Sequence, residues 1–185
     1  GKAADGAKAL IDELHSALDP KAYRKAVALL AESEFIDIFG VENSLTPAMD
    51  LFTKLGYLGL TCRLNTDAYL QQIGAGHLPH GAVAVAFSHS GSSADTVKAL
   101  RLAKSHGAKT IAITNAIGAP LASWADVTLL TGRDSHTIYG NAIFSRVADT
   151  ALVDMLYMGV ILSDYGRFST ALDESGRMIR DRVFE

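Results

Sequence analysis

The sequence predicts an α/β protein, a doubly wound three-layer sandwich built on a five-stranded parallel sheet. Two observations carry this prediction. Short apolar runs alternate with helical patterns, and the run Ala82–Phe87 stops abruptly at a hydroxyl-rich cluster where a helical pattern begins. An unbroken apolar run bounded by turn residues is typical of a strand covered on both faces, as in a parallel sheet. Alternating strands and helices imply right-handed crossovers, and we expect the strand order 2-1-3-4-5.

Two helices are expected at the start of the chain, over Ala3–Leu18 and Pro20–Ala31. Asp19 lies between them and can cap the second helix, whose first position is then a proline, a residue favoured there. These helices form the predicted N-terminal unit, residues 1–33, and the main domain is predicted over residues 34–185.

Five strands are expected where short apolar runs end at turn residues. The predicted strands are Phe35–Phe39, Leu60–Leu64, Ala82–Phe87, Thr110–Thr114 and Val127–Leu130. Gly40 closes the first strand, and a short turn over Pro120–Trp124 leads into the fifth.

A helix is expected after the first strand. Thr46 and Pro47 are predicted to be its cap and its first residue, and Met49, Phe52 and Leu55 are predicted to point inward. These five positions therefore predict a helix that packs against the sheet.

Helices are also expected after the second and third strands. Asp67 is predicted to begin one that runs to about Ile73. Ser92 and Asp95 have the spacing of a capping box at the start of the next, and Gly107 is predicted to end it. We expect this helix to bury Val97, Leu100 and Ala103 and to expose Lys98, Arg101 and Lys104.

Apolar residues recur at helical spacing over Ile138–Leu162, and include Phe144, Met155 and Met158. We interpret the methionines as core residues, because a methionine side chain fills irregular gaps in a core. The breadth of this apolar stripe suggests burial against the sheet or against a partner subunit.

Composition limits the function. The chain has 185 residues, 49% of them hydrophobic, with 17 basic and 20 acidic residues and a formal charge of -3. Such a surface does not favour nucleic acid. Cys62 is the only cysteine, which excludes an internal disulfide and a cysteine-cluster metal site. No apolar stretch is long enough to span a bilayer, so we expect a cytoplasmic protein without membrane partners.

The hydroxyl cluster after the third predicted strand is suited to binding an anion. Ser88, Ser90, Ser92 and Ser93 surround Gly91, whose backbone can take conformations that a side chain would obstruct. A strand-to-helix junction offers unpaired amides and the positive end of a helix dipole, and the serines add neutral donors. The alternative is an ordinary serine-rich turn.

With the strand order 2-1-3-4-5, the chain reverses direction between the first and third strands. Ligands in such folds bind at that switch, beyond the carboxyl ends of the strands. The two loops predicted to lie there are Gly40–Ser44 and Ser88–Ser93, and each leads into a helix. Their expected convergence is the main physical argument for a binding site.

Several kinds of site are absent from the sequence. It has no G-x-x-x-x-G-K-[ST] and no G-x-G-x-x-G motif, and its six histidines show no metal-ligand spacing. We therefore expect no cofactor and no metal. Ser88 beside His89 is no catalytic pair, because adjacent residues at a strand end point in opposite directions. His89 could line the site or be merely exposed on its loop.

Glu42 leaves two interpretations open. A carboxylate in the first loop could be the base that moves a proton between sugar carbons, with His89 or His136 as its partner. The alternative is a loop carboxylate that faces solvent, because no matched acid follows from the spacing.

These residues resemble a known family. The segments Phe87–Thr96, Ala103–Thr114 and Pro120–Asp126 are similar to the sugar isomerase (SIS) domain. The pair Ser145–Arg146 at the start of an apolar helix is similar to the branch of that family found in RpiR-type transcriptional regulators. The resemblance extends from about residue 34 to residue 162.

The resemblance implies a flavodoxin-like five-stranded sheet that binds a phosphorylated sugar or sugar acid, as a homodimer or tetramer. Ser88, Ser90 and Ser93 would hold the phosphate with the amides near Gly91 and Ser92. The predicted ligand-binding residues are Asn43, Ser44, Ser88, His89, Ser90, Gly91, Ser92 and Ser93, with no catalytic residue. His136, Tyr139 and Asn141 would line the sugar half of the pocket.

In such regulators an N-terminal helix-turn-helix domain reads DNA, and the bound sugar phosphate tunes it. This chain lacks that domain, so Ala3–Leu18 would be the linker helix that follows it. The implied function is therefore a non-catalytic effector domain, and the alternative is an aldose–ketose sugar-phosphate isomerase. Glu42 departs from the family, whose first loop commonly has a small residue, and a carboxylate there would repel phosphate unless it bonds sugar hydroxyls.

Overall fold

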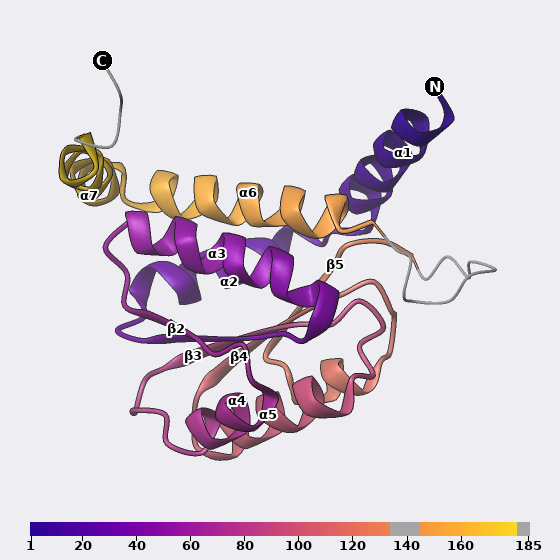
Figure 1. Ribbon diagram of the computed structural model, residues 1–185, viewed down its shortest axis with the longest axis horizontal. Coiled ribbons are helices and arrows are strands. Elements are labelled where there is room, and N and C mark those ends of the chain that lie inside the picture. The colour runs from indigo at the N-terminus through magenta and orange to yellow at the C-terminus, as the bar shows by residue number, and fades with distance from the viewer. Residues whose placement is uncertain (134–144, 181–185) are drawn as a thin grey trace.

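The computed structural model describes residues 1–133 and 145–180, which form three layers around a parallel sheet (Figure 1). The strands lie in the order β2-β1-β3-β4-β5, and all neighbouring pairs are parallel. Their bounds are Ile36–Phe39 (β1), Cys62–Leu64 (β2), Val83–Phe87 (β3), Lys109–Thr114 (β4) and Val127–Leu130 (β5). The predicted fold class and strand order are confirmed.

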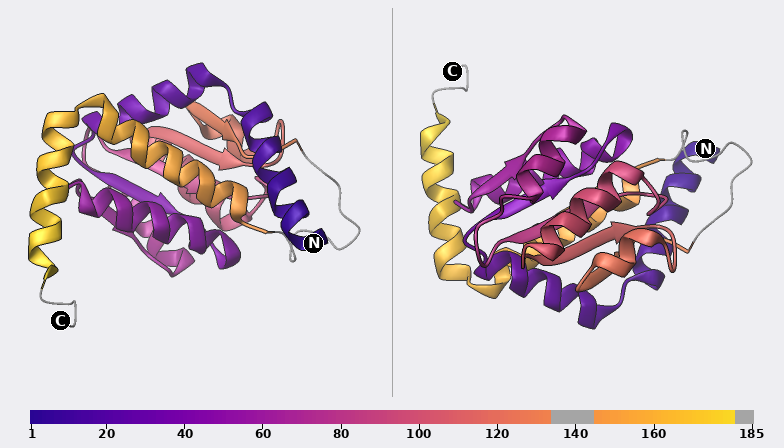
Figure 2. Two further views of the ribbon diagram at one scale, coloured as in Figure 1. Left: turned by 90° about the horizontal axis from the view of Figure 1, so that it is seen from above. Right: turned by 90° about the horizontal axis from the view of Figure 1, so that it is seen from below.

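Helices cover both faces of the sheet (Figure 2). One face carries α2 (Pro20–Glu32), α3 (Leu45–Tyr57) and α6 (Val147–Ser163), and the other carries α4 (Ala68–Ala75) and α5 (Ala94–Ser105). A 3-10 helix over Pro120–Trp124 precedes β5, as predicted. At the ends of the chain, α1 (Lys2–Ala17) and α7 (Tyr165–Met178) both pack against α6. None of the helices in the described ranges is long and apolar enough to cross a membrane.

The central strand β3 divides the core into two parts. Val83, Val85 and Phe87 belong to the cluster shared with α2, α3 and α6. Ala84 and Ala86 alternate with them and face the cluster shared with α5. Because these alanines are small, α5 can pack close to β3, and the start of α5 lies directly beyond the end of the strand.

Two of the caps predicted from local sequence, Asp19 and Asp67, are confirmed. The Asp19 carboxylate accepts hydrogen bonds from the amides of Lys21 and Ala22 at the start of α2. Asp67 accepts one from the amide of Leu70 at the start of α4. The division between residues 1–33 and residues 34–185 stays a prediction.

The predicted start of α3 is wrong. A 3-10 turn over Glu42–Ser44 runs directly into the helix, so the cap position is Ser44 and the helix begins two residues before Pro47. The helix turns Ala48, Leu51 and Leu55 to the core, whereas Met49, predicted to point inward, is 44% exposed.

The methionines of α6 are also placed differently from the prediction. Leu152, Leu156 and Val160 face the core, but Met155 and Met158 are 37% and 49% exposed. A helix that packs against a sheet buries one of its faces, and in α6 the opposite face is apolar as well. The part of the predicted helix before Ser145, including Phe144, lies outside the described residues.

A buried ion pair joins the first two strands. Asp37 of β1 lies opposite Arg63 of β2, whose Nε and Nη2 donate to the two carboxylate oxygens at 3.0 and 2.6 Å. The Asp37 residue is 1% exposed, so burial raises the pKa of its carboxyl, and the hydrogen bonds from Arg63 offset part of that rise. The guanidinium also fills the space beside Gly74 of α4, so the pair ties the sheet to the helix layer.

We expect Arg63→Ala to lower the free energy of unfolding at pH 7 by about 3–5 kcal/mol, because it leaves Asp37 buried and uncompensated. Because the pKa of the Asp37 carboxyl is raised in the folded state, the cost of the substitution depends on pH. The charge on Asp37 destabilises the variant least below pH 3.8, the ordinary pKa, and increasingly as the pH rises towards the folded-state pKa of Asp37. Urea denaturation at pH 4 and pH 7 measures both effects. A double variant with Asp37→Asn added should lose the pH dependence, and a cost that is equal at the two pH values would contradict the assignment.

Candidate functional site

A cavity of about 410 Å³ opens at the carboxyl edge of β1 and β3. This volume suits a small organic ligand. Its lining comes mainly from the two loops predicted to converge there, and comprises Val41, Glu42, Asn43, Ser44, Ser88, His89, Ser90, Ser93, Asp95 and Arg146. The predicted convergence of residues 40–44 with residues 88–93 is confirmed.

The first loop is held by a buried glutamine that sequence reasoning missed. Gln71 of α4 is 1% exposed, and its side chain accepts from the amide of Gly40 at 3.3 Å and donates to the Gly40 carbonyl at 2.7 Å. It also donates to the Asn65 carbonyl at 2.8 Å. These bonds hold the chain where it leaves β1, so the turn that follows delivers Ser44, which is 8% exposed, into the cavity wall.

Glu42 has an unusual backbone conformation. Among the described residues it is the one non-glycine residue with a positive φ, at 51°. A side chain in the left-handed region costs free energy, and residues held there are concentrated at functional sites. Glu42 lines the cavity together with His89, and its side chain is also exposed to solvent.

The serine loop is shaped by Gly91. Its φ is +61°, and a Cβ there would lie 2.4 Å from the Cβ of Ala119 and 2.9 Å from Oγ1 of Thr114. Its amide donates to the Ser88 carbonyl at 3.0 Å, and its carbonyl accepts from the amide of Leu121 at 2.9 Å. Glycine is therefore required both by conformation and by space.

The start of α5 faces the cavity without a side-chain cap. Ser93 is the cap residue, and its hydroxyl makes no capping hydrogen bond; it accepts from Thr96 Oγ1 at 3.3 Å instead. The predicted capping box of Ser92 and Asp95 is wrong, because the Ser92 hydroxyl donates back to the Ser90 carbonyl at 3.2 Å. The helix dipole and the amides of the first turn are thus directed at the loop that carries Ser88 and Ser90.

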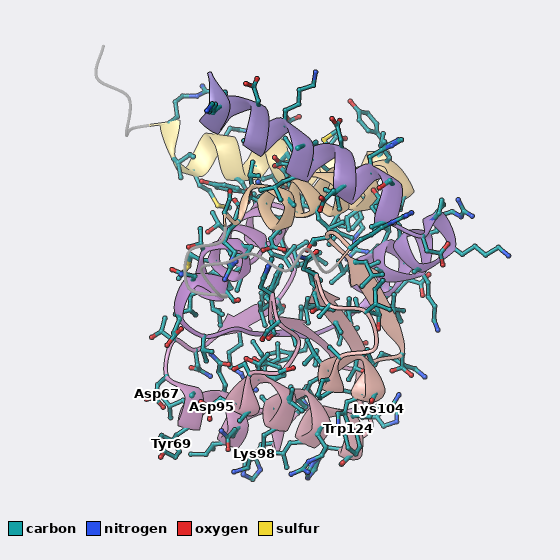
Figure 3. The ribbon with its side chains drawn as sticks, turned by 90° about the vertical axis from the view of Figure 1, so that its right-hand side faces the viewer. Asp67, Tyr69, Asp95, Lys98, Lys104 and Trp124 are labelled. Carbon is teal, nitrogen blue, oxygen red and sulfur yellow. The ribbon has the colours of Figure 1, made fainter. Side chains whose placement is uncertain are left out.

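Asp95 is turned towards α4. Its carboxylate accepts from Gln72 Nε2 at 3.1 Å, and Figure 3 shows it near the end of α4 at which Asp67 and Tyr69 lie. Asp95 lines the cavity, but one of its carboxylate oxygens accepts a hydrogen bond from α4 rather than from the serine loop.

His89 is fixed from behind by β4. Its carbonyl accepts from Thr114 Oγ1 and from the Asn115 amide, both at 3.1 Å, and its Nε2 lies 3.4 Å from Asn115 Nδ2. Of the two alternatives that the sequence left open, the structure favours the first, because the residue lines the cavity and is half-buried.

Arg146 lines the cavity and, like Asp95, was not placed in the site by sequence reasoning. It is the cap residue of α6, on the face of the sheet opposite α5, and 13% of its side chain is exposed. Its Nε lies 3.8 Å from the Asp149 carboxylate. Burial raises the pKa of Asp149, and the hydrogen bond from Thr131 and the charge of Arg146 act against that rise. The only signal in the sequence was the Ser145–Arg146 pair of the family resemblance.

A family model, described as the SIS domain, matches residues 29–159. The chain belongs to the SIS-domain family. The match covers both loops of the cavity and most of α6, so the fold and the cavity of this SIS domain are found in the region that defines the family.

Curated relatives of this SIS domain include HTH-type transcriptional regulators. An uncharacterised HTH-type transcriptional regulator of Caldanaerobacter subterraneus is 30% identical over 181 residues, which are 98% of this chain. The HTH-type transcriptional regulator HexR of Escherichia coli is 28% identical over 185 residues, the whole of this chain. The chain spans 64% of the length of each.

Solved structures share the fold. The Vibrio vulnificus NanR protein, in a complex with ManNAc-6P, superposes with a TM-score of 0.91 at 24% identity, covering 98% of this chain and 69% of NanR. The sugar isomerase domain of an RpiR transcription factor from Sphaerobacter thermophilus has a TM-score of 0.84 at 22% identity, covering 94% of this chain and 95% of that domain. A putative sugar-phosphate isomerase of Listeria monocytogenes has a TM-score of 0.76 at 17% identity, covering 93% and 90%.

Most of the predicted ligand-binding residues of this SIS domain meet in one place. Asn43, Ser44, Ser88, His89, Ser90 and Ser93 line the cavity. Gly91 and Ser92 do not line it but shape the serine loop behind it. That these residues bind a ligand stays a prediction. His136, Tyr139 and Asn141 lie outside the described residues.

Gly91→Ala is expected to destabilise this SIS domain by about 2–4 kcal/mol, as the sum of the left-handed backbone cost and of overpacking against Ala119. Gly107→Ala is a matched control, because Gly107 has a φ of +87° but nothing within 4 Å of its Cβ position. The control should lose only about 1–2 kcal/mol. Urea denaturation of both variants measures the difference, and equal losses would show that the close approach at Gly91 does not matter.

Proposed function

We propose that this chain is the phosphosugar-binding effector domain of an RpiR-type transcriptional regulator of carbohydrate metabolism. The observation that carries the proposal is the cavity in which the serine loop meets the uncapped start of α5. In this proposal Ser88, Ser90 and Ser93 bind the phosphate group, and Ser44 approaches it from the first loop.

The chemistry of the cavity supports a phosphate monoester. Serine hydroxyls rotate to meet phosphate oxygens, and a helix N-terminus adds amides and a favourable dipole. Ser88 is 4% exposed, so a hydrogen bond that it makes to a ligand is formed in a setting of low dielectric, where it is stronger than in water. The complex of NanR with ManNAc-6P, a phosphorylated sugar bound to a protein of the same fold, is consistent with this proposal.

The relatives support a regulatory role. Since the chain spans 64% of two HTH-type regulators, we propose that DNA is bound by a helix-turn-helix domain that precedes α1 in the full protein. The formal charge of -3 agrees with a chain that does not bind DNA itself. We also propose that the regulator is a cytoplasmic homodimer or tetramer; the exposed apolar face of α6 agrees with a subunit contact.

A sugar phosphate at 100 times its dissociation constant should stabilise the protein by about 2.7 kcal/mol. Ser88→Ala combined with Ser90→Ala should remove this stabilisation, because it deletes two of the proposed phosphate donors. Thermal denaturation with N-acetylmannosamine 6-phosphate, glucose 6-phosphate and inorganic phosphate measures it.

The matched control is Ser105→Ala combined with Ser169→Ala. These hydroxyls bond to the carbonyls of Arg101 and Gly166, away from the cavity, so the control should keep the full stabilisation. If sugar phosphates stabilise the double variant at Ser88 and Ser90 as much as they stabilise the control, the assignment of the phosphate site is wrong.

A second candidate function is an aldose–ketose isomerase. It is favoured by the strained Glu42, which lines the cavity together with His89, the pairing that a proton transfer between sugar carbons needs. The solved structures of this fold include a putative sugar-phosphate isomerase. The regulatory function remains the better supported, because the relatives that match most of this chain are regulators.

Proton exchange separates the two functions. An effector domain should incorporate no deuterium from D₂O into aldose or ketose phosphates, because binding alone leaves the C–H bonds intact. An isomerase would exchange the proton next to the carbonyl, and Glu42→Gln would abolish that exchange. Proton NMR over a panel of pentose and hexose phosphates measures it, and exchange by the wild-type chain would overturn the non-catalytic assignment.

A further inference from the structure

Arg146 lines the cavity, and two nitrogens of its guanidinium make no hydrogen bond to the described residues. Its Nε and Nη1 are buried and have no hydrogen-bond partner within residues 1–133 and 145–180. The Asp149 carboxylate, at 3.8 Å from Nε, is beyond hydrogen-bonding distance. Arg146 is therefore a nearly buried cation in the cavity wall that forms an ion pair with Asp149 and keeps two donors without an acceptor among the described residues.

Unbonded donors on a buried charge are costly for the folded state. The cost is removed when an oxyanion binds, and the planar fork of an arginine matches the two oxygens of a carboxylate especially well. The arrangement therefore indicates a ligand group with negative charge beside Arg146.

This group is separate from the phosphate. Ser88, Ser90 and Ser93, the main proposed phosphate donors, lie at the start of α5. Arg146 lies at the start of α6, and these two helices cover opposite faces of the sheet (Figure 1). The cavity of about 410 Å³ reaches both. The serine loop and the amides of α5 already supply donors for one phosphate, so Arg146 is left for a second oxyanion.

We propose that Arg146 binds a carboxylate of the ligand, so that the cavity selects phosphorylated sugar acids over neutral sugar phosphates. This inference rests on the proposed function and narrows its ligand class. The other cavity charges allow it. Asp95 is bonded to Gln72, and Glu42 is exposed, so water screens its repulsion.

Isothermal titration calorimetry with matched ligands tests the proposal. The probes are 6-phosphogluconate, which carries phosphate and carboxylate, glucose 6-phosphate, which lacks the carboxylate, and gluconate, which lacks the phosphate. The wild-type chain should bind 6-phosphogluconate at least tenfold more tightly than glucose 6-phosphate, and gluconate most weakly. Arg146→Gln should remove the preference and change the affinity for glucose 6-phosphate less than twofold.

Arg101→Gln is the matched control. Arg101 lies on α5 with its guanidinium over Trp124, so the variant loses the same charge outside the cavity and should keep the preference. If Arg146→Gln does not fold, Arg146→Lys is measured in its place. Lysine keeps the positive charge but lacks the planar guanidinium, so this variant should bind 6-phosphogluconate more weakly and glucose 6-phosphate as before.

Three outcomes would overturn the proposal in distinguishable ways. Equal wild-type affinity for the two phosphorylated probes would exclude a carboxylate site. Equal weakening of both by Arg146→Gln would assign Arg146 to the phosphate instead. If neither phosphorylated probe nor any other sugar phosphate binds, the proposed function itself is wrong, and the inference falls with it.

Discussion

The close approach of the serine loop to β4 at Gly91 determines the geometry of the cavity. The loop backbone lies against Ala119 and Thr114, with no room for a Cβ, and hydrogen bonds on both sides of the glycine hold it there. This contact sets where β3 ends and where α5 begins. Because the cap hydroxyl of α5 makes no capping bond, the first amides of α5 are left for a ligand in the cavity, where the positive end of the helix dipole also lies.

Charged pairs brace both outer parts of the sheet. Asp37 and Arg63 join β1 to β2, and Asp126 accepts hydrogen bonds from Lys104 and from the amide and hydroxyl of Thr110, which ties α5 and β4 to the start of β5. Burial acts to raise the pKa of Asp126, but these hydrogen bonds and the Lys104 charge hold it below its ordinary value. A braced sheet keeps the two loops in register, as a preorganised binding site requires.

The segment behind His89 is also in contact with the N-terminal helix. A Cβ at Gly132 would lie 2.0 Å from Asn115 Oδ1 and 3.2 Å from Glu13 Oε2, so this glycine is packed between the residue behind His89 and α1. Arg133 donates to the Ser16 carbonyl at 3.1 Å and adds a second contact with the same helix. Regulation requires that a ligand bind two states unequally. These contacts join the residues behind His89 to the helix that the proposed function places next to the DNA-binding domain.

The sequence alone determined the strands, the caps at Asp19 and Asp67, and the convergence of the two loops. The strands and caps follow from local patterns, because side-chain periodicity and capping depend on residues near one another in the chain. The convergence follows from the strand order expected of alternating strands and helices, which places both loops at one edge of the sheet. Only the tertiary structure decided that Asp37 pairs with Arg63, that Met155 and Met158 face outward, and that Arg146 reaches the cavity. Each of these depends on which distant elements meet, and the sequence pattern of one element does not contain the position of its neighbour.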